Sequence, residues 1–488
     1  MKWQRKINIE VLSIILLGFL VSATSLQAQD NKPQNVVFIL SDDHRFDFMG
    51  FHPDAPEYIK TPNLDRMARE GVHIRNAFVT TSLCSPSRAS ILTGQYAHTH
   101  KVVDNTSPIP EGTRFFNEDV QKNGYKTAFI GKWHMGESVD DPKPGWDHWV
   151  SFRGQGVYFN PTLNVDGKRD IYSGYTSDIL TDFAVDWLKE RKEDSEEPFF
   201  LYLSHKAVHA EFIPAERHQD EYEDIDIEYP ATMDKTEQNY RTKPKWVKAQ
   251  RNSWHGVDYA YHGDMNFDEF YKSYLKTLLA LDESVGRVLD YLAESGLDEN
   301  TLVIYMGDNG FMHGEHGLID KRNAYEESIR VPMIAWAPGY LEPDTVIDQL
   351  IRNIDIAPTI LDVFGAESSI DMDGLSFLPL LTDPSKTIEE REFLYEYYWE
   401  PAFPHTPTTF SLRGDRYKYI YYHGVWDRDE LYDLQNDPEE RYNLAEVPGF
   451  IELRNEMRSR LFDVMESEDA MSIPVRRFNW QADEKQID

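Results

Sequence analysis

The 488-residue sequence contains one cysteine, Cys84, and little positive charge. A single cysteine cannot form a disulfide within its own chain, so packing alone must stabilise the fold. Lysines and arginines number 50 against 84 aspartates and glutamates, which gives a net charge of -34. Such a chain repels polyanions at long range, so we expect no nucleic-acid partner, and any polyanionic substrate needs a local basic cleft.

Long hydrophobic runs are also missing, except at the start of the chain. The basic residues Lys2, Arg5 and Lys6 precede an apolar run over residues 11–21, and small and polar residues follow through Ala28. This order is typical of a signal peptide, and the run is shorter than the roughly 20 residues that a membrane-spanning helix needs. We therefore expect residues 1–28 to be removed on export. The mature protein is then expected to be periplasmic or secreted, without attachment to the membrane. The alternative interpretation is that the apolar run anchors the protein in the membrane.

The remaining chain is longer than one simple hydrophobic core usually requires, so we expect a catalytic domain over 29–385 and a C-terminal subdomain over 386–488. Short apolar runs predict buried strands at 35–40, 126–131, 199–204 and 302–306. Helical patterns lie between them at 61–71 and 267–295. Strands that alternate with helices predict an α/β sandwich.

Two other regions have a different pattern. Residues 211–262 are polar and carry an acidic cluster. They are interpreted as an excursion loop with a solvated surface, because the glycine spacing of a calcium loop is missing.

Aromatic residues alternate at 393–399 and 417–423, before a helical pattern over 451–465. This predicts antiparallel strands half covered by a helix.

Polar residues follow the predicted buried strands. They are Asp42 and Asp43, Lys132 and His134, Asp308 and Asn309, and, slightly further along, His209. Ligands bind at the carboxyl ends of strands in open α/β sheets, so these side chains are expected to form one site. Carboxylate and amide oxygens suit calcium or magnesium better than zinc. Zinc at His313 and His316 is the competing hypothesis, but the HGEH segment lacks the HExxH spacing.

Cys84 begins the segment C-S-P-S-R. If Ser85 caps a helix and Pro86 begins it, residue 84 lies at a helix N-terminus, where free amides attract an anion. Arg88 adds a planar cation. Two alternatives are a structural thiol beside an ordinary capped helix and a thiolate nucleophile with a lowered pKa. Hard oxygen ligands match a thiolate poorly.

These motifs resemble the type I sulfatase family of the alkaline-phosphatase superfamily, whose maturation signature C-x-P-S-R is present at residues 84–88. The resemblance continues through SDDHR (41–45), TPNLDRMAREG (61–71), GKWHMG (131–136), SHKAVHA (204–210) and GDNGFMHGEHGLIDKRNAYE (307–326). It covers most of the mature chain. Val208 stands where the family usually has a proline before the histidine corresponding to His209.

The resemblance implies a fold and a cofactor. The fold is an alkaline-phosphatase-like sandwich with a large mixed sheet between helices, plus a C-terminal subdomain with an antiparallel sheet and a helix. A formylglycine-generating maturation enzyme converts Cys84 to formylglycine. Calcium, with magnesium as the alternative, is held by Asp42, Asp43, Asp308 and Asn309 and by the modified residue 84.

The resemblance also implies roles for individual residues. A hydroxyl of hydrated formylglycine attacks sulfur with help from Asp308, and His209 or Lys321 protonates the leaving alcohol. His134 is the base that allows sulfate to be eliminated. Arg88 and Lys132 offset negative charge in the transition state.

The expected substrate is a sulfated polysaccharide or its oligosaccharides. The 307–326 segment resembles carbohydrate sulfatases, including N-acetylglucosamine-6-sulfatases and ulvan sulfatases, which favours an algal or glycosaminoglycan saccharide. Trp146, Trp149 and Tyr158 could stack on a sugar or belong to the core. One alternative function is a formylglycine-dependent phosphonate or phosphate ester hydrolase. The other is a catalytically inactive sulfatase-like binding protein, which would lack a motif residue, and none is missing.

Overall fold

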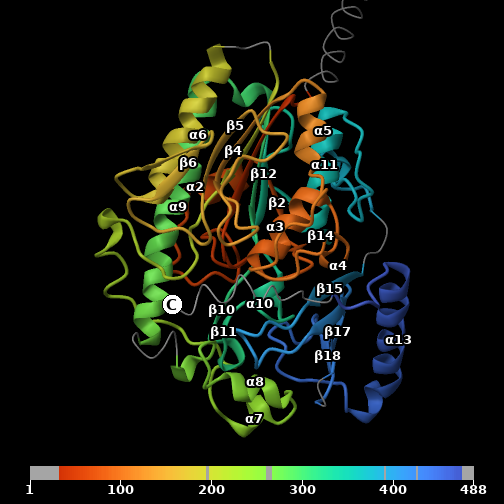
Figure 1. Ribbon diagram of the computed structural model, residues 1–488. Helices are drawn as coiled ribbons and strands as arrows, with labels where there is room; N and C mark the ends of the chain where they lie inside the picture. Colours follow the sequence, from red (N-terminus) through yellow and green to blue (C-terminus); the bar gives the residue numbers. More distant parts are fainter. Residues whose placement is uncertain (1–31, 194–196, 260–265, 389–391, 425–426, 475–488) are drawn as a thin grey trace, which may run out of the picture.

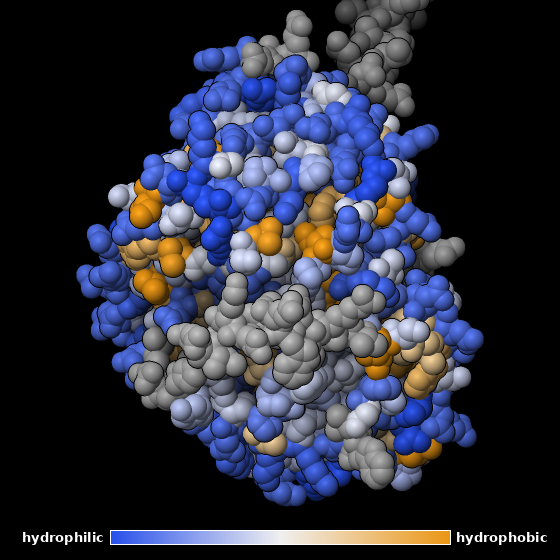
Figure 2. Space-filling view, viewed as in Figure 1, coloured by the Kyte–Doolittle hydropathy of each residue, from blue (hydrophilic) through white to orange (hydrophobic). Residues whose placement is uncertain are grey.

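The computed structural model describes residues 32–193, 197–259, 266–388, 392–424 and 427–474. The predicted signal peptide, residues 1–28, lies outside these ranges. No helix among the described residues is long and apolar enough to cross a membrane. The face shown in Figure 2 is predominantly hydrophilic, with apolar side chains in small scattered groups.

A ten-stranded mixed sheet forms the centre of the fold, in the order β13-β2-β12-β9-β1-β8-β4-β5-β6-β7. The four predicted strands are confirmed as β1 (Asn35–Ser41), β4 (Lys126–Lys132), β8 (Phe199–Ser204) and β9 (Thr301–Gly307). They are neighbours and run parallel. The other strands are β2 (Val72–Ile74), β5 (His148–Phe152), β6 (Thr162–Val165), β7 (Lys168–Ile171), β12 (Met333–Trp336) and β13 (Thr345–Ile347).

Helices cover both faces of this sheet (Figure 1). The helices α2 (Pro62–Arg69), α6 (Thr176–Glu193) and α9 (Phe267–Ser295) pack on the face to which Val37 and Ile39 point. The helices α3 (Cys84–Thr93), α5 (Phe116–Lys122) and α11 (Ile356–Phe364) pack on the face of Val36 and Phe38. Because both faces are covered, β1 is apolar at successive positions rather than alternating, as parallel strands in α/β folds usually are.

The C-terminal region forms a separate antiparallel sheet of β15 (Phe393–Tyr397), β16 (Thr409–Arg413), β17 (Tyr417–Tyr422) and β18 (Glu430–Asp433). Helix α13 (Ile451–Ser467) packs on it through Met457, Leu461 and Met465. The predicted aromatic strands and the covering helix are confirmed, whereas β16 and β18 were not predicted. The domain boundary near residue 385 stays a prediction.

Short elements complete the fold. The polar region 211–262 is not only a loop, because it contains η1 (Glu216–His218), α7 (Glu237–Tyr240) and α8 (Lys245–Gln250). The remaining short helices and strands are α4 (Ala97–His100), α10 (Glu326–Ile329), α12 (Leu378–Thr382), η3 (Asp298–Asn300), η4 (Glu315–Gly317), η5 (Asn353–Asp355), η6 (Pro448–Phe450), β3 (Ala77–Phe78), β10 (Met312–His313), β11 (Ile319–Asp320) and β14 (Ile351–Arg352).

Gly131 of β4 allows the backbone of β8 to approach closely. A side chain at position 131 should therefore destabilise the fold strongly. The φ of Gly131 is +123°, and an added Cβ would lie 1.7 Å from the backbone oxygen of Ser204. We expect Gly131→Ala to lower the free energy of unfolding by about 3 kcal/mol or more, since backbone cannot move aside cheaply. Denaturant unfolding measures this. Gly449→Ala, with nothing within 4 Å of the added Cβ, is the control and should change stability by less than about 0.5 kcal/mol. Equal effects in the two variants would refute the explanation.

Candidate active site

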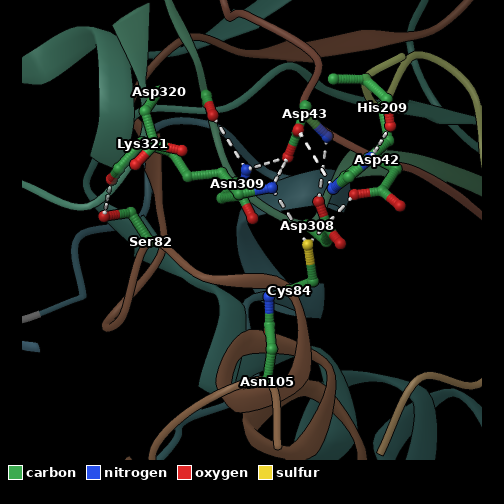
Figure 3. A network of polar contacts seen from close by, with 12 residues as sticks. Asp42, Asp43, Ser82, Cys84, Asn105, His209, Asp308, Asn309, Asp320 and Lys321 are labelled. Carbon is green, nitrogen blue, oxygen red and sulfur yellow. Dashed lines mark hydrogen bonds and ion pairs between the residues drawn. The ribbon is translucent and has the colours of Figure 1, made fainter. Parts of the chain in front are cut away.

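The carboxyl ends of four adjacent parallel strands bring the predicted site residues together (Figure 3). Asp42 and Asp43 follow β1, and Asp308 and Asn309 follow β9. Lys132 ends β4, and His209 follows β8. Backbone bonds fix the strand ends to one another: the Asp308 N–H donates to the Ser41 oxygen at 2.9 Å, and the Asp42 N–H donates to the Ala207 oxygen at 2.9 Å.

Val208 adds a contact that a proline could not make. Its N–H donates to the Asp42 carbonyl oxygen at 2.7 Å. Proline has no N–H, so the departure from the family pattern gives the β1 and β8 loops one further hydrogen bond. His209 therefore follows a backbone segment that is tied directly to Asp42.

Cys84 is the first residue of α3, but Ser85 does not cap the helix as predicted. The N-cap is Leu83, which makes no side-chain cap bond. The Ser85 hydroxyl instead donates to the His134 carbonyl oxygen, and the Ser85 N–H donates to Asn105 Oδ1 at 3.1 Å. Neither contact can be read from local sequence. The side chain of Cys84 points from the helix end toward the carboxylates (Figure 3).

The Cys84 sulfur lies in a fully buried polar environment. Its thiol donates to Asp42 Oδ1 at 3.3 Å, and the Lys321 ammonium donates to the sulfur at 3.1 Å. Burial raises the pKa of the thiol to about 12, and the negative charge of Asp42 acts in the same direction. Both effects disfavour a thiolate in the metal-free protein. A purely structural thiol would sit among apolar groups.

Two lysines neutralise the carboxylates that follow β1. Lys132 donates to Asp42, and Lys321 donates to Asp43. Burial alone would raise the pKa of Asp42, but the charge of Lys132, with those of neighbouring cations, holds it well below its usual range. Burial raises the pKa of Asp43 to about 7 despite the charge of Lys321.

Arg88 pairs with the third carboxylate. Its Nε and one terminal nitrogen lie 2.9 and 2.8 Å from Asp308 Oδ2. Its other terminal nitrogen donates to the Lys132 carbonyl oxygen at 2.8 Å and to Ser204 Oγ at 2.6 Å. Burial and the charge of Asp42 raise the pKa of Asp308. Arg88 thus anchors Asp308 rather than facing an open cavity.

The donor set fits a hard divalent cation. One ligand atom from each of Asp42, Asp43, Cys84 and His209 lies within 4.8 Å of the others, and among the described residues this is the only such group. Asn309 Oδ1 is buried without a hydrogen-bond partner, as expected of an oxygen available to a metal. Asp308 lies beside the group and accepts from the Asp43 N–H at 3.1 Å. His313 and His316 are not part of it.

The two candidate histidines occupy different positions. The Nδ1–H of His209 donates to the Ala210 carbonyl oxygen, and its Nε2 lies 3.8 Å from Asp43 Oδ2. Burial holds the pKa of His209 well below its usual value, and Lys132 adds to this effect. His134 lies next to Ser85, with Nδ1 3.4 Å from the Ser85 hydroxyl. Burial and then Lys132 lower its pKa to about 4.

The structure decides between the two interpretations of three aromatics near the site, and it adds two residues that the sequence did not single out. Trp146 and Trp149 pack in the core. Tyr158 is also buried, so these three aromatics offer no platform for a sugar. The sequence did not single out Lys206, which lies over the Tyr158 ring with its Nζ 4.6 Å from the centroid. Gln155 was missed as well; its Oε1 accepts from Lys132 Nζ at 2.5 Å.

A second cluster adjoins Lys321. Arg322 pairs with Asp320 at 2.9 Å and with Glu400 at 2.8 Å, and its guanidinium carbon lies 3.5 Å from the centroid of the Phe403 ring. Trp254, 40% exposed, lies near the same ring. Sequence patterns could not join these residues, because they come from three separate segments.

Comparison with known proteins agrees with this geometry. Residues 34–366 match the family described as Sulfatase, and residues 314–467 match that described as N-sulphoglucosamine sulphohydrolase, C-terminal. The chain belongs to the sulfatase family. It is therefore a sulfuric ester hydrolase, and the family implies a metal ion and a formylglycine formed from Cys84 at this cluster.

Individual relatives cover most of the chain. An N-acetylglucosamine-6-O-sulfatase of Bacteroides thetaiotaomicron is 32% identical over 91% of this chain and 88% of its own length. The N-acetylglucosamine-6-sulfatase of Homo sapiens is 30% identical over 82% of this chain and 74% of its own length. A solved structure in complex with its substrate, D-glucosamine-2-N,6-O-disulfate, has a TM-score of 0.83 and 29% identity, covering 91% of this chain and all of the other.

The donor set predicts that a divalent cation stabilises the sulfatase. We expect calcium or magnesium to raise the melting temperature of chelator-treated protein, because a ligand at 100 times its Kd stabilises by about 2.7 kcal/mol. Asp43→Asn should abolish most of this shift and lower turnover by orders of magnitude. Asp170→Asn, at an exposed position of β7, is the control. It should keep the metal-induced rise in melting temperature and the turnover of the wild type. An undiminished turnover in protein shown by elemental analysis to be metal-free would contradict the assignment.

Proposed function

We propose that this sulfatase is an exported, calcium-dependent enzyme that hydrolyses sulfate esters on carbohydrate through a formylglycine made from Cys84. The observation that carries the proposal is the Cys84 side chain itself, which leaves the first turn of α3 and lies between Asp42 and Lys321. Residues 1–28 would direct export to the periplasm or the medium, and a formylglycine-generating enzyme would modify the chain. The hard oxygen donors favour calcium, with magnesium as the alternative.

The chain's own residues supply positioning, charge and protons. When present, the hydrated formylglycine and the metal supply the nucleophile and polarise the sulfate. Lys132 and Lys321 place ammonium groups beside residue 84, where they stabilise negative charge on the transferred group. Arg88 fixes Asp308 through one hydrogen bond from Nε and an ion-pair contact from a terminal nitrogen, which orients this carboxylate to accept a proton.

We propose that one acid and one base complete the proton transfers. His209 or Lys321 gives a proton to the departing sugar oxygen, and both lie beside Asp43. His134, which lies next to the Ser85 hydroxyl, acts as the base when sulfate is released. A buried site makes these transfers efficient, because water does not compete for the reacting atoms.

The proposed substrate is a saccharide that carries a 6-O-sulfated glucosamine, as in glycosaminoglycans. The names of the relatives support this choice over an algal polysaccharide such as ulvan. The cluster of Asp320, Arg322 and Trp254 adjoins Lys321 and offers what a sugar requires, namely polar groups for hydroxyls and an exposed aromatic face.

Replacement of Cys84 tests the nucleophile. We expect Cys84→Ala to abolish sulfate release from 6-O-sulfated glucosamine oligosaccharides while the melting temperature changes little, since one small side chain is lost. Ion chromatography of released sulfate measures the activity. Phenyl phenylphosphonate, a phosphonate monoester, should be a poor substrate when it is assayed alongside; a rate of phosphonate ester hydrolysis that exceeds the sulfate rate would favour the phosphonate hydrolase instead.

A comparison of leaving groups tests the proton donor. If His209 protonates the departing oxygen, His209→Ala should slow a sulfated sugar by about 10²- to 10⁴-fold and 4-nitrophenyl sulfate far less. The reason is that a sugar alkoxide is much more basic than a nitrophenolate. Rates of sulfate and nitrophenol release give the two losses. Equal losses would remove His209 from this role and leave Lys321 as the donor.

A further inference from the structure

Four buried cations belong to the site, and one of them lacks a counter-ion. Lys132, Lys321 and Arg88 each contact a carboxylate. Lys206, which follows β8, is only 4% exposed. Within the ranges that the structure describes, its ammonium has no carboxylate within ion-pair distance and no hydrogen-bond acceptor. Lysines are rarely buried without such a partner.

The aromatic ring of Tyr158 contacts the Lys206 ammonium close to the active site. The Lys206 Nζ lies 4.6 Å from the centroid of the Tyr158 ring, and the Tyr158 hydroxyl donates to the His209 carbonyl oxygen at 2.6 Å. Lys206 is therefore linked through one aromatic ring to the segment that carries His209. Burial lowers the pKa of Lys206 to about 8, and the charge of Lys132 acts in the same direction.

The position of Lys206 differs from that of the other two lysines. Lys321 lies 3.1 Å from the Cys84 sulfur, and Lys132 contacts Asp42 beside it. These two cations already lie where the transferred sulfate must bind. Lys206 makes no contact of hydrogen-bond length with Cys84, Asp42 or Asp43 in the described chain. It is instead linked to the His209 segment through Tyr158, so it is free to contact a part of the substrate other than the transferred sulfate.

We propose that Lys206 binds a second anionic group of the saccharide, a sulfate, sulfamate or carboxylate close to the sulfate that is removed. The assignment rests on the proposed function and narrows its substrate class to saccharides with at least two negative charges near each other. A desolvated ammonium that lacks an anion gains a charge-assisted hydrogen bond when such a group enters. The cation–π contact with Tyr158 keeps the ammonium in place before the substrate arrives.

Matched substrates and variants test this role. The substrates are D-glucosamine-2-N,6-O-disulfate, a 6-O-sulfated glucosamine linked to a uronate, singly charged N-acetylglucosamine-6-sulfate, and 4-nitrophenyl sulfate. We expect Lys206→Met to lower kcat/KM for at least one doubly charged saccharide by about 10- to 100-fold, mainly through KM. The loss on the two singly charged substrates should be much smaller. Lys206→Arg, which keeps the positive charge, should retain most of the preference for doubly charged over singly charged substrates. Lys206→Gln provides a second neutral variant.

The outcomes separate this proposal from the one on which it rests. Equal losses on singly and doubly charged substrates would overturn it, because Lys206 would then contact the transferred sulfate. No loss on any substrate in either neutral variant would overturn it too. Melting temperature and metal content of the variants show whether a loss arises from misfolding. A wild-type enzyme that hydrolyses 4-nitrophenyl sulfate but no sulfated saccharide would instead refute the proposed function.

Discussion

The fold of the active centre depends on pairing three buried carboxylates with three buried cations. Asp42 and Asp43 follow β1 and Asp308 follows the neighbouring β9, and Lys132, Lys321 and Arg88 neutralise them. Removing one member of such a set leaves an uncompensated buried charge, which typically costs about 3–5 kcal/mol. The arrangement is therefore poorly tolerant of change at any position. It also explains why the net charge of -34 does not prevent an anionic substrate from binding, since the local charges and the metal, not the distant surface, determine the field at Cys84.

The parallel sheet is what makes this concentration of charge possible. Four strands with apolar side chains on both faces end side by side, and each delivers a polar group at the same edge. Burial in two helix layers gives the strand ends fixed positions, and α3 adds Cys84 from the opposite direction. The C-terminal sheet is tied to the catalytic region by buried polar contacts, such as that between His98 and Glu396 at 3.0 Å. The site is thus a product of long-range topology, although each contributing motif is short.

Much of this could be predicted from sequence because buried strands have a clear apolar signature. The strands at β1, β4, β8 and β9 and the helix over 267–295 were found from hydrophobic pattern alone, and the polar residues after those strands converge as expected. Contacts that depend on tertiary packing could not be predicted. Ser85 appeared to be a helix cap but bonds to His134 and Asn105. The sequence left open whether Tyr158 stacks on a sugar or belongs to the core, and in the structure it is buried with Lys206 over its ring. Strands β16 and β18 carry no distinct local signal and form only by pairing with β17 and β15.

The central claim is that Cys84 acts as an aldehyde formed from its thiol. Burial raises the pKa of the unmodified residue to about 12, which disfavours a thiolate in the metal-free protein. Mass spectrometry of the peptide that contains residue 84, taken from protein with measured sulfatase activity, tests the claim most directly. The account predicts a peptide lighter than the thiol form by the difference between a CH2SH and a CHO group. Full activity in protein that carries only the unmodified thiol would contradict it.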